Sequence, residues 1–269
     1  MILIESRSRR RHPPADVLVI LLPAAVGALL CAIDLGSRSL WLDEGSTFAI
    51  ASQHGEALWR GIGRDGGNML AYYLLIHVLI GWLGDASWLL RLPSVIANAA
   101  TGALVAAIGL RLLGRRRAAL AAGLLTVAAP VLIYWGQQAR GYSLMVTFTC
   151  ASFLALIAIL QTPARYRAPR RWVAVYVISL LAAFYIGYDV ALVIPAQLLM
   201  LWLFPERTRV ILASLVLVAV LSTPLAVLAL ERGSGQLFWV PGLSLQVAGQ
   251  TLTNLLYAGI APSFHRAWG

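Results

Sequence analysis

The chain is a succession of long apolar runs separated by short polar gaps. Most runs approach or exceed the ~20 residues that a helix needs to cross the hydrocarbon core of a membrane. They lack the strict alternation that is typical of a membrane β-barrel. The pattern therefore predicts an all-α polytopic membrane protein with about seven transmembrane helices, at residues 17–34, 89–111, 118–135, 142–161, 172–186, 188–204 and 210–230.

The loop between the first two runs, residues 35–88, is too patterned for an irregular connection. Met69 to Leu83 is apolar but short, and its Tyr72, Tyr73 and Trp82 suit the headgroup region of a membrane. Ser46 to Ile62 carries apolar and polar side chains on different sides of a helix. We expect both segments to be juxtamembrane helices, and residues 243–260 to form one more surface helix.

Charge adds an orientation to this pattern. The chain has 60% hydrophobic residues and a net charge of +10, and all 21 basic residues are arginines. They cluster in alternate gaps, before the first run and near residues 111–117, 165–171 and 207–209, whereas most acids lie in the other gaps. The positive-inside rule makes the arginine-rich gaps and the amino terminus cytoplasmic. Topology and contact with membrane lipids explain the charge, so a nucleic-acid partner is not expected.

This orientation divides the chain into three parts. Residues 1–16 form a cytoplasmic arginine-rich tail, residues 17–230 the transmembrane domain with its structured outer loop, and residues 231–269 an extracytoplasmic segment. The first run lacks a small-residue cleavage site and is expected to be a retained anchor. Arginine without lysine suggests a GC-rich genome, and hence a multi-pass protein of a bacterial plasma membrane.

Cysteine and histidine add no chemistry to this picture. Cys31 and Cys150 fall inside predicted spans and suit packing. The four histidines show no spacing typical of metal ligands, so no metal site is assigned.

The most informative polar feature is a pair of adjacent acids, Asp43 and Glu44, just beyond the outer end of the first span. Two neighbouring carboxylates at a membrane surface suit proton transfer or cation binding. The competing interpretation is structural, because aspartate also caps helices and a helix is expected to begin near Ser46.

Several segments, in this order, resemble the family 39, protein O-mannosyltransferase-like glycosyltransferases. The resemblance covers about residues 38–260 and rests on Trp41 to Glu44, Tyr72 to His77, Arg91 to Val95, Gln137 to Leu144 and Phe238 to Pro241. It implies a GT-C fold. It also implies transfer of a sugar from a polyprenyl-phosphate donor to an extracytoplasmic hydroxyl of a lipid, glycan or protein.

The resemblance assigns roles to particular residues. Asp43 matches the catalytic acid and is expected to act as general base, while Arg91 and Arg140 are expected to bind the donor phosphate. Three roles stay open for Glu44: orienting the acceptor, helping to hold a divalent cation, or accepting hydrogen bonds from the loop. The substrate cavity is expected to include Asp65, Asn68, Tyr72, Gln138, Tyr142 and Asp189.

Some features depart from the family pattern. The prolines that usually follow the second acid are absent after Asp65 and Asn68, and Gln138 replaces a usual glutamate. Family members also continue with further spans, so we expect this chain to be the amino-terminal half, active alone or with a partner subunit that supplies missing helices. The alternatives are a non-catalytic scaffold and a lipid or solute transporter.

Overall fold

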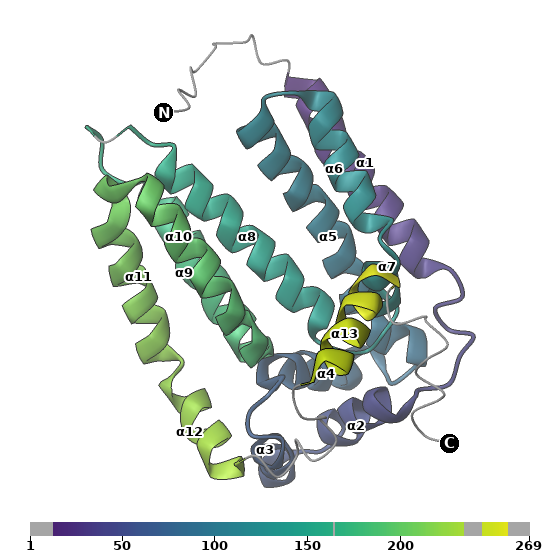
Figure 1. Cartoon of the computed structure of the whole chain (residues 1–269). Helices are drawn as coiled ribbons and strands as arrows, with labels where there is room; N and C mark the ends of the chain where they lie inside the picture. Colours follow the sequence, from purple (N-terminus) through teal and green to yellow (C-terminus); the bar gives the residue numbers. More distant parts are fainter. Residues whose placement is uncertain (1–12, 164, 234–243, 258–269) are drawn as a thin grey trace.

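The computed structural model describes residues 13–163, 165–233 and 244–257. Within these ranges every regular element is a helix, which confirms the all-α class (Figure 1). The elements that carry the bundle are α1 (Pro13–Ala32), α5 (Ser87–Leu113), α6 (Arg116–Val127), α7 (Pro130–Gly136), α8 (Tyr142–Leu160), α9 (Arg170–Ile186), α10 (Ile194–Leu203), α11 (Thr208–Leu221) and α12 (Thr223–Arg232). Residues 1–12 of the expected tail and Phe238 to Pro241 lie outside the described residues.

The bundle consists of two packed groups of helices. α1, α5 and α6 contact one another, α9 packs against both α8 and α11, and α5 joins the groups by packing against α8. Small residues permit close approach in the first group. A Cβ added at Gly102 would lie 2.4 Å from Val127 Cγ1, and one added at Gly123 would lie 2.7 Å from Pro23 Cγ. Such small residues are typical of helix contacts inside membranes.

Among the described residues, three helices, α1, α5 and α8, are long and apolar enough to cross a membrane. The number rises to five if each bent pair counts as one span, namely α6 with α7, bent by 58°, and residues 188–202 with 205–221, bent by 118°. Several helices that could span a membrane confirm the polytopic class, while the expected number of seven stays a prediction. Two expected spans are broken by proline, because Pro130 begins α7 and Pro224 lies in the first turn of α12.

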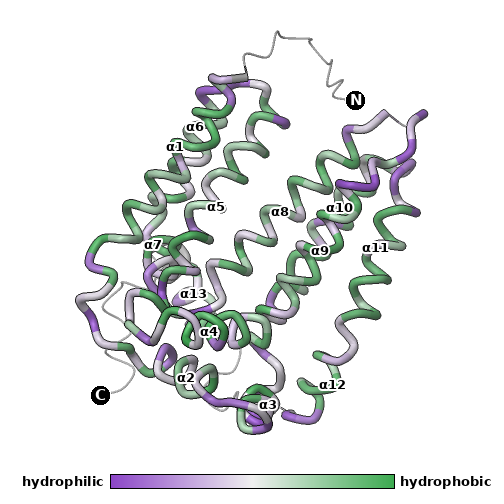
Figure 2. Tube along the Cα trace, turned by 180° about the vertical axis from the view of Figure 1, so that it is seen from behind, coloured by the Kyte–Doolittle hydropathy of each residue, from purple (hydrophilic) through white to green (hydrophobic). Residues whose placement is uncertain are grey.

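The arginine-rich gaps meet at one end of the bundle. Arg207 Nη2 donates hydrogen bonds of 2.8 Å to the carbonyls of Thr162 and Pro163, and Arg116 forms a 2.7 Å ion pair with Asp16. The hydropathy colouring shows green helix centres and more polar ends (Figure 2). The arginine-rich gaps, which alternate with the other gaps along the sequence, therefore lie at the same end of the folded bundle. Which end faces the cytoplasm stays a prediction.

Short helices lie at the opposite end, beneath the long ones (Figures 1 and 2). They are α2 (Leu42–Ala51), α3 (Gly55–Arg64) and α4 (Leu70–Leu83), so the loop after the first expected span contains helices as expected, while their place beside a membrane stays a prediction. Tyr72, Tyr73 and Ile76 of α4 are buried against Ala51 of α2 and Ile62 of α3. The single helix expected over Ser46 to Ile62 is wrong, because the chain breaks between α2 and α3. The expected helix near the carboxyl end is α13 (Leu245–Tyr257), which contacts α7.

Candidate functional site

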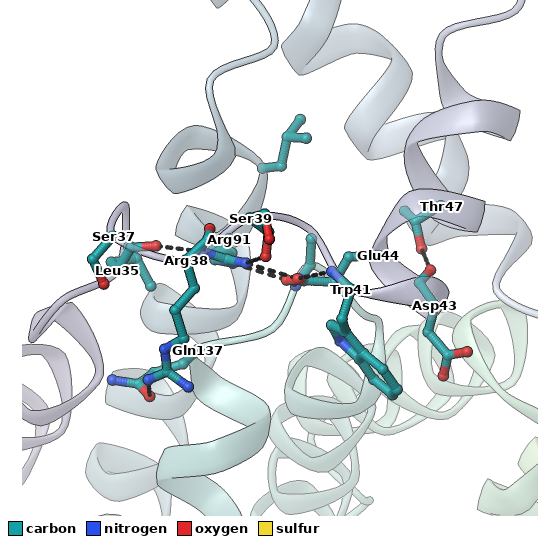
Figure 3. Close-up of polar contacts among 12 residues, drawn as sticks. Leu35, Ser37, Arg38, Ser39, Trp41, Asp43, Glu44, Thr47, Arg91 and Gln137 are labelled. Carbon is teal, nitrogen blue, oxygen red and sulfur yellow. Dashed lines mark hydrogen bonds and ion pairs between the residues drawn. The ribbon is translucent and has the colours of Figure 1, made fainter.

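The two adjacent acids lie in the first turn of α2. This helix begins at Leu42 rather than near Ser46, and Glu44 Oε2 accepts a 3.3 Å hydrogen bond from the Trp41 amide. Asp43 is therefore inside the helix and is not its cap. Consecutive helical residues point about 100° apart. Figure 3 shows the Glu44 carboxylate directed at Arg91 and the Asp43 carboxylate directed away from it.

Glu44 is fully buried and forms a two-point ion pair with Arg91 of α5. Arg91 Nε donates to Glu44 Oε1 over 2.8 Å, and Arg91 Nη2 donates to Oε2 over 2.7 Å. The Ala139 amide donates to Glu44 Oε1 over 2.7 Å. Burial alone would raise the pKa of the Glu44 carboxyl, but the hydrogen bonds from Arg91 and Ala139 outweigh it and lower that pKa below its usual value.

The Arg91 guanidinium has no N–H group left for a ligand. Besides its two bonds to Glu44, Nη1 donates to the carbonyls of Leu35 (2.7 Å) and Arg38 (3.0 Å), and Nη2 donates to that of Ser39 (3.1 Å). A guanidinium carries five N–H groups, and all five are used here (Figure 3). The geometry gives Arg91 a structural role: it ties the loop after α1 to α2 and α5.

The Asp43 side of the turn opens onto a cavity of about 1170 Å³. Asp43 is half-buried, and its carboxylate has no hydrogen-bond or ion-pair partner among the described residues. The charged side chains of the lining are those of two aspartates and four arginines, so an anionic ligand is favoured. They are Asp43, Asp65, Arg60, Arg64, Arg140 and Arg232.

Arg140 is the expected phosphate ligand that the structure places beside Asp43. Its Nη1 donates to Thr47 Oγ1 over 3.3 Å and lies 3.5 Å from the Asp43 carbonyl, while its Nε is buried without a partner among the described residues. The segment that carries Arg140 is fixed on both sides. Glu44 holds the amide of Ala139, and Ser94 Oγ donates to the Arg140 carbonyl over 3.1 Å.

Asp65 lines the same cavity but is fully engaged. Its carboxylate accepts a 2.8 Å hydrogen bond from the Tyr73 hydroxyl and forms a 3.1 Å ion pair with Arg232 at the end of α12. Arg232 also donates to the Asp65 carbonyl, and the Tyr188 hydroxyl donates to that of Gly66. These contacts close the cavity between α3 and α12. Asp65 is thus less suited than Asp43 to accept a proton.

The fold places the remaining expected cavity residues at different sites. Asn68 and Tyr142 line the large cavity. Tyr72 is fully buried instead, with its hydroxyl 3.5 Å from the Leu90 carbonyl. Gln138 lines a second, smaller cavity together with Glu44 and Arg91. Asp189 is exposed and lines neither cavity, although its neighbour Tyr188 lines the large one.

Sequence reasoning did not assign Tyr73, Arg60, Arg64 or Arg232 to the site, although all four line the large cavity. Tyr73 was assigned only to the headgroup region. Arg232 had one available signal, since it is an arginine directly after Glu231 in a gap outside the arginine clusters. For a divalent cation, the part of the chain that the structure describes brings together no group of three or more His, Cys, Asp or Glu side chains that could hold a metal.

The helices define a polytopic membrane protein, and the cavity at one end of its bundle is lined by more arginines than acids. The sequence model of the dolichyl-phosphate-mannose-protein mannosyltransferase family matches residues 67–230, more than half of the chain. The chain therefore belongs to this family of GT-C glycosyltransferases. Searches of the curated proteins and of the solved structures found no match. The matched segment contains Arg91 and Arg140 but begins after Asp43 and Glu44.

Proposed function

We propose that the chain transfers a sugar from a polyprenyl-phosphate-linked donor to an acceptor hydroxyl, with Asp43 as general base. The observation that carries this proposal is the pairing, in one cavity, of the Asp43 carboxylate and the Arg140 guanidinium: neither the carboxylate nor Nε has a hydrogen-bond partner among the described residues. The family supports sugar transfer. The donor, the acceptor and the extracytoplasmic side are part of the proposal, as is a bacterial plasma membrane.

The chemistry is a single displacement. The acceptor oxygen forms a bond to the anomeric carbon while the bond from that carbon to the phosphate oxygen breaks. The hydroxyl proton passes to the Asp43 carboxylate, and the bond electrons leave with the polyprenyl phosphate. In this proposal Arg140, whose Nη1 donates to Thr47 and whose Nε has no partner among the described residues, stabilises the negative charge that develops on the phosphate.

Glu44 and Arg91 take positioning roles in this proposal. Of the three roles left open for Glu44, the geometry favours hydrogen bonding to the loop, because Trp41, Ala139 and Arg91 occupy its carboxylate. Arg91 was expected to bind phosphate. We revise that role, because a phosphate would have to displace Glu44 or a backbone carbonyl from it.

The test measures sugar transfer in membranes that contain this chain, supplied with a panel of radiolabelled polyprenyl-phosphate sugars. Asp43→Asn keeps the size of the side chain but removes the base. We expect transfer to fall by about 10²- to 10⁴-fold. Asp85→Asn is the matched control, because Asp85 is exposed and lines neither cavity.

Arg140 variants separate charge from geometry. Arg140→Gln is expected to lose most of the transfer, and Arg140→Lys to recover only part of it, because lysine cannot form two parallel hydrogen bonds to a phosphate. Full transfer by Asp43→Asn would exclude Asp43 as the base. Folded wild-type chain without transfer from any donor would favour a scaffold, and uptake into vesicles would then favour a transporter.

A further inference from the structure

A second cavity lies on the Glu44 side of the first turn of α2. It measures about 270 Å³ and is bounded by the loop after α1, by α2, by α5 and by the end of α7. Its volume is below the roughly 300–1,000 Å³ of pockets for drug-sized ligands, so it suits one small unit such as a sugar ring. The side chains that could meet a ligand there are those of Asp34, Arg38, Trp41, Tyr134, Gln137 and Gln138.

The charges of this cavity balance. Two acids, Asp34 and Glu44, face two arginines, Arg38 and Arg91. Glu44 and Arg91 neutralise each other, and Arg38 Nη2 donates to Gln137 Oε1 over 3.3 Å. The large cavity, by contrast, has an excess of arginine. The smaller one therefore favours a neutral polar ligand over a phosphate.

Two aromatic rings and two amides supply the contacts. Trp41 and Tyr134 both line the cavity, and their side chains are accessible there, since the two residues are 40% and 38% exposed. Gln138 is over nine-tenths buried, and its Oε1 has no hydrogen-bond partner among the described residues. Ring faces beside amide groups match a sugar, which has apolar C–H faces and a rim of hydroxyls that donate and accept hydrogen bonds.

We propose that this second cavity binds a neutral sugar unit of the acceptor, so that the acceptor is a glycan. This inference rests on the proposed transfer to a hydroxyl near Asp43. Asp43 and Glu44 are consecutive, so their Cα atoms lie about 3.8 Å apart. Asp43 lines the large cavity and Glu44 lines the second one, so we expect a glycan with one sugar in the second cavity to place a neighbouring hydroxyl at Asp43.

Direct binding tests the inference without catalysis. Wild-type chain in lipid nanodiscs is mixed with mannobiose, maltose or chitobiose, and saturation-transfer NMR detects contact between protein and disaccharide. We expect a signal from at least one disaccharide. Trp41→Ala should weaken that binding about tenfold or more, because it removes an aromatic face but keeps the backbone amide that binds Glu44.

Trp82→Ala is the matched control, because Trp82 is 83% exposed on α4 and lines neither cavity. It should leave binding unchanged. Thermal unfolding of each variant identifies any loss that comes from misfolding, and Tyr134→Phe provides a second, milder probe. Absence of binding to all three disaccharides, binding retained in Trp41→Ala, or equal loss in Trp82→Ala would overturn the proposal.

The transfer assay separates this inference from the proposed function. Asp43→Asn should abolish transfer and keep disaccharide binding, whereas Trp41→Ala should raise the KM for a glycan acceptor and leave kcat nearly unchanged. If Asp43→Asn abolishes transfer but the wild type binds no disaccharide, the glycosyltransferase proposal stands and the sugar cavity is wrong. If the wild type binds disaccharide but transfers no donor sugar, the sugar cavity stands and the glycosyltransferase proposal is wrong.

Discussion

The two sides of the first turn of α2 differ in how their polar groups are used. On the Glu44 side, a buried carboxylate and a buried guanidinium use their hydrogen-bonding groups on each other and on the backbone. On the Asp43 side, a half-buried carboxylate has no partner among the described residues and opens onto a large cavity. Neighbouring acids thus have different tasks: one fixes the backbone, and the other is available to a ligand.

The difference also explains how the two sides depend on each other. The Ala139 amide binds Glu44, and the next residue in the chain is Arg140, which reaches toward Thr47 and the Asp43 carbonyl. The contacts of Glu44 therefore position Arg140, which lies on the Asp43 side. Breaking the Glu44–Arg91 pair should therefore reduce stability, and removing Asp43 or the Arg140 guanidinium should reduce activity.

The largest expected effect comes from breaking the buried pair. Arg91→Leu leaves the Glu44 carboxylate buried without its cation and leaves three carbonyls without a donor, so we expect a loss of about 3–5 kcal/mol in the free energy of unfolding. Denaturant unfolding in detergent measures it. The double variant Glu44→Leu with Arg91→Leu should cost less than the sum of the single variants, because no unpaired charge remains.

An additive result would contradict the pairing. So would an Arg91→Leu variant that unfolds like the wild type but no longer binds the donor, because that outcome would return Arg91 to the phosphate role expected from the sequence. Arg167→Leu is a suitable control, since Arg167 is exposed and lines neither cavity.

A smaller effect is expected from the pair that closes the large cavity, Asp65 and Arg232. Their side chains are 22% and 18% exposed, so breaking the pair should cost about 1 kcal/mol. The exchange variant, Asp65→Arg with Arg232→Asp, should recover part of that cost. If the pair only closes the cavity, the exchange should also recover sugar transfer. If Arg232 contacts the donor, stability should recover and transfer should not.

The sequence predicted the fold class because apolar runs and arginine clusters are local signals. The resemblance assigned Asp43 and Arg140 to one reaction; both line the large cavity, and their roles stay predictions. The sequence could not tell Arg91 from Arg140, since both are arginines near the outer ends of spans. Only the fold shows that Glu44 and three loop carbonyls use every N–H group of Arg91, whereas Nε of Arg140 has no partner among the described residues.

Long-range contacts account for the other omissions. Asp65 and Arg232 are separated by 167 residues, and nothing in either local sequence indicates the other. The break between α2 and α3 was missed because residues 46–62 keep a helical pattern across it. Which cavity a polar residue lines depends on the direction of its side chain within one helical turn. A pattern of residue types does not give that direction until the first residue of the helix is known.

The smallest expected effect is a pH dependence of the stability, which comes from Glu44. The folded protein lowers the pKa of Glu44 from its ordinary value of 4.5, so the folded state binds fewer protons there than the unfolded state. The stabilisation is complete above about pH 4.5 and is lost as the pH falls through the folded pKa. Thermal unfolding between pH 3 and pH 6 should therefore show the wild type approaching Glu44→Gln in stability as the solution becomes acidic. Glu56→Gln, which changes an exposed side chain, should follow the wild type; a constant difference between wild type and Glu44→Gln at every pH would contradict the ionised pair.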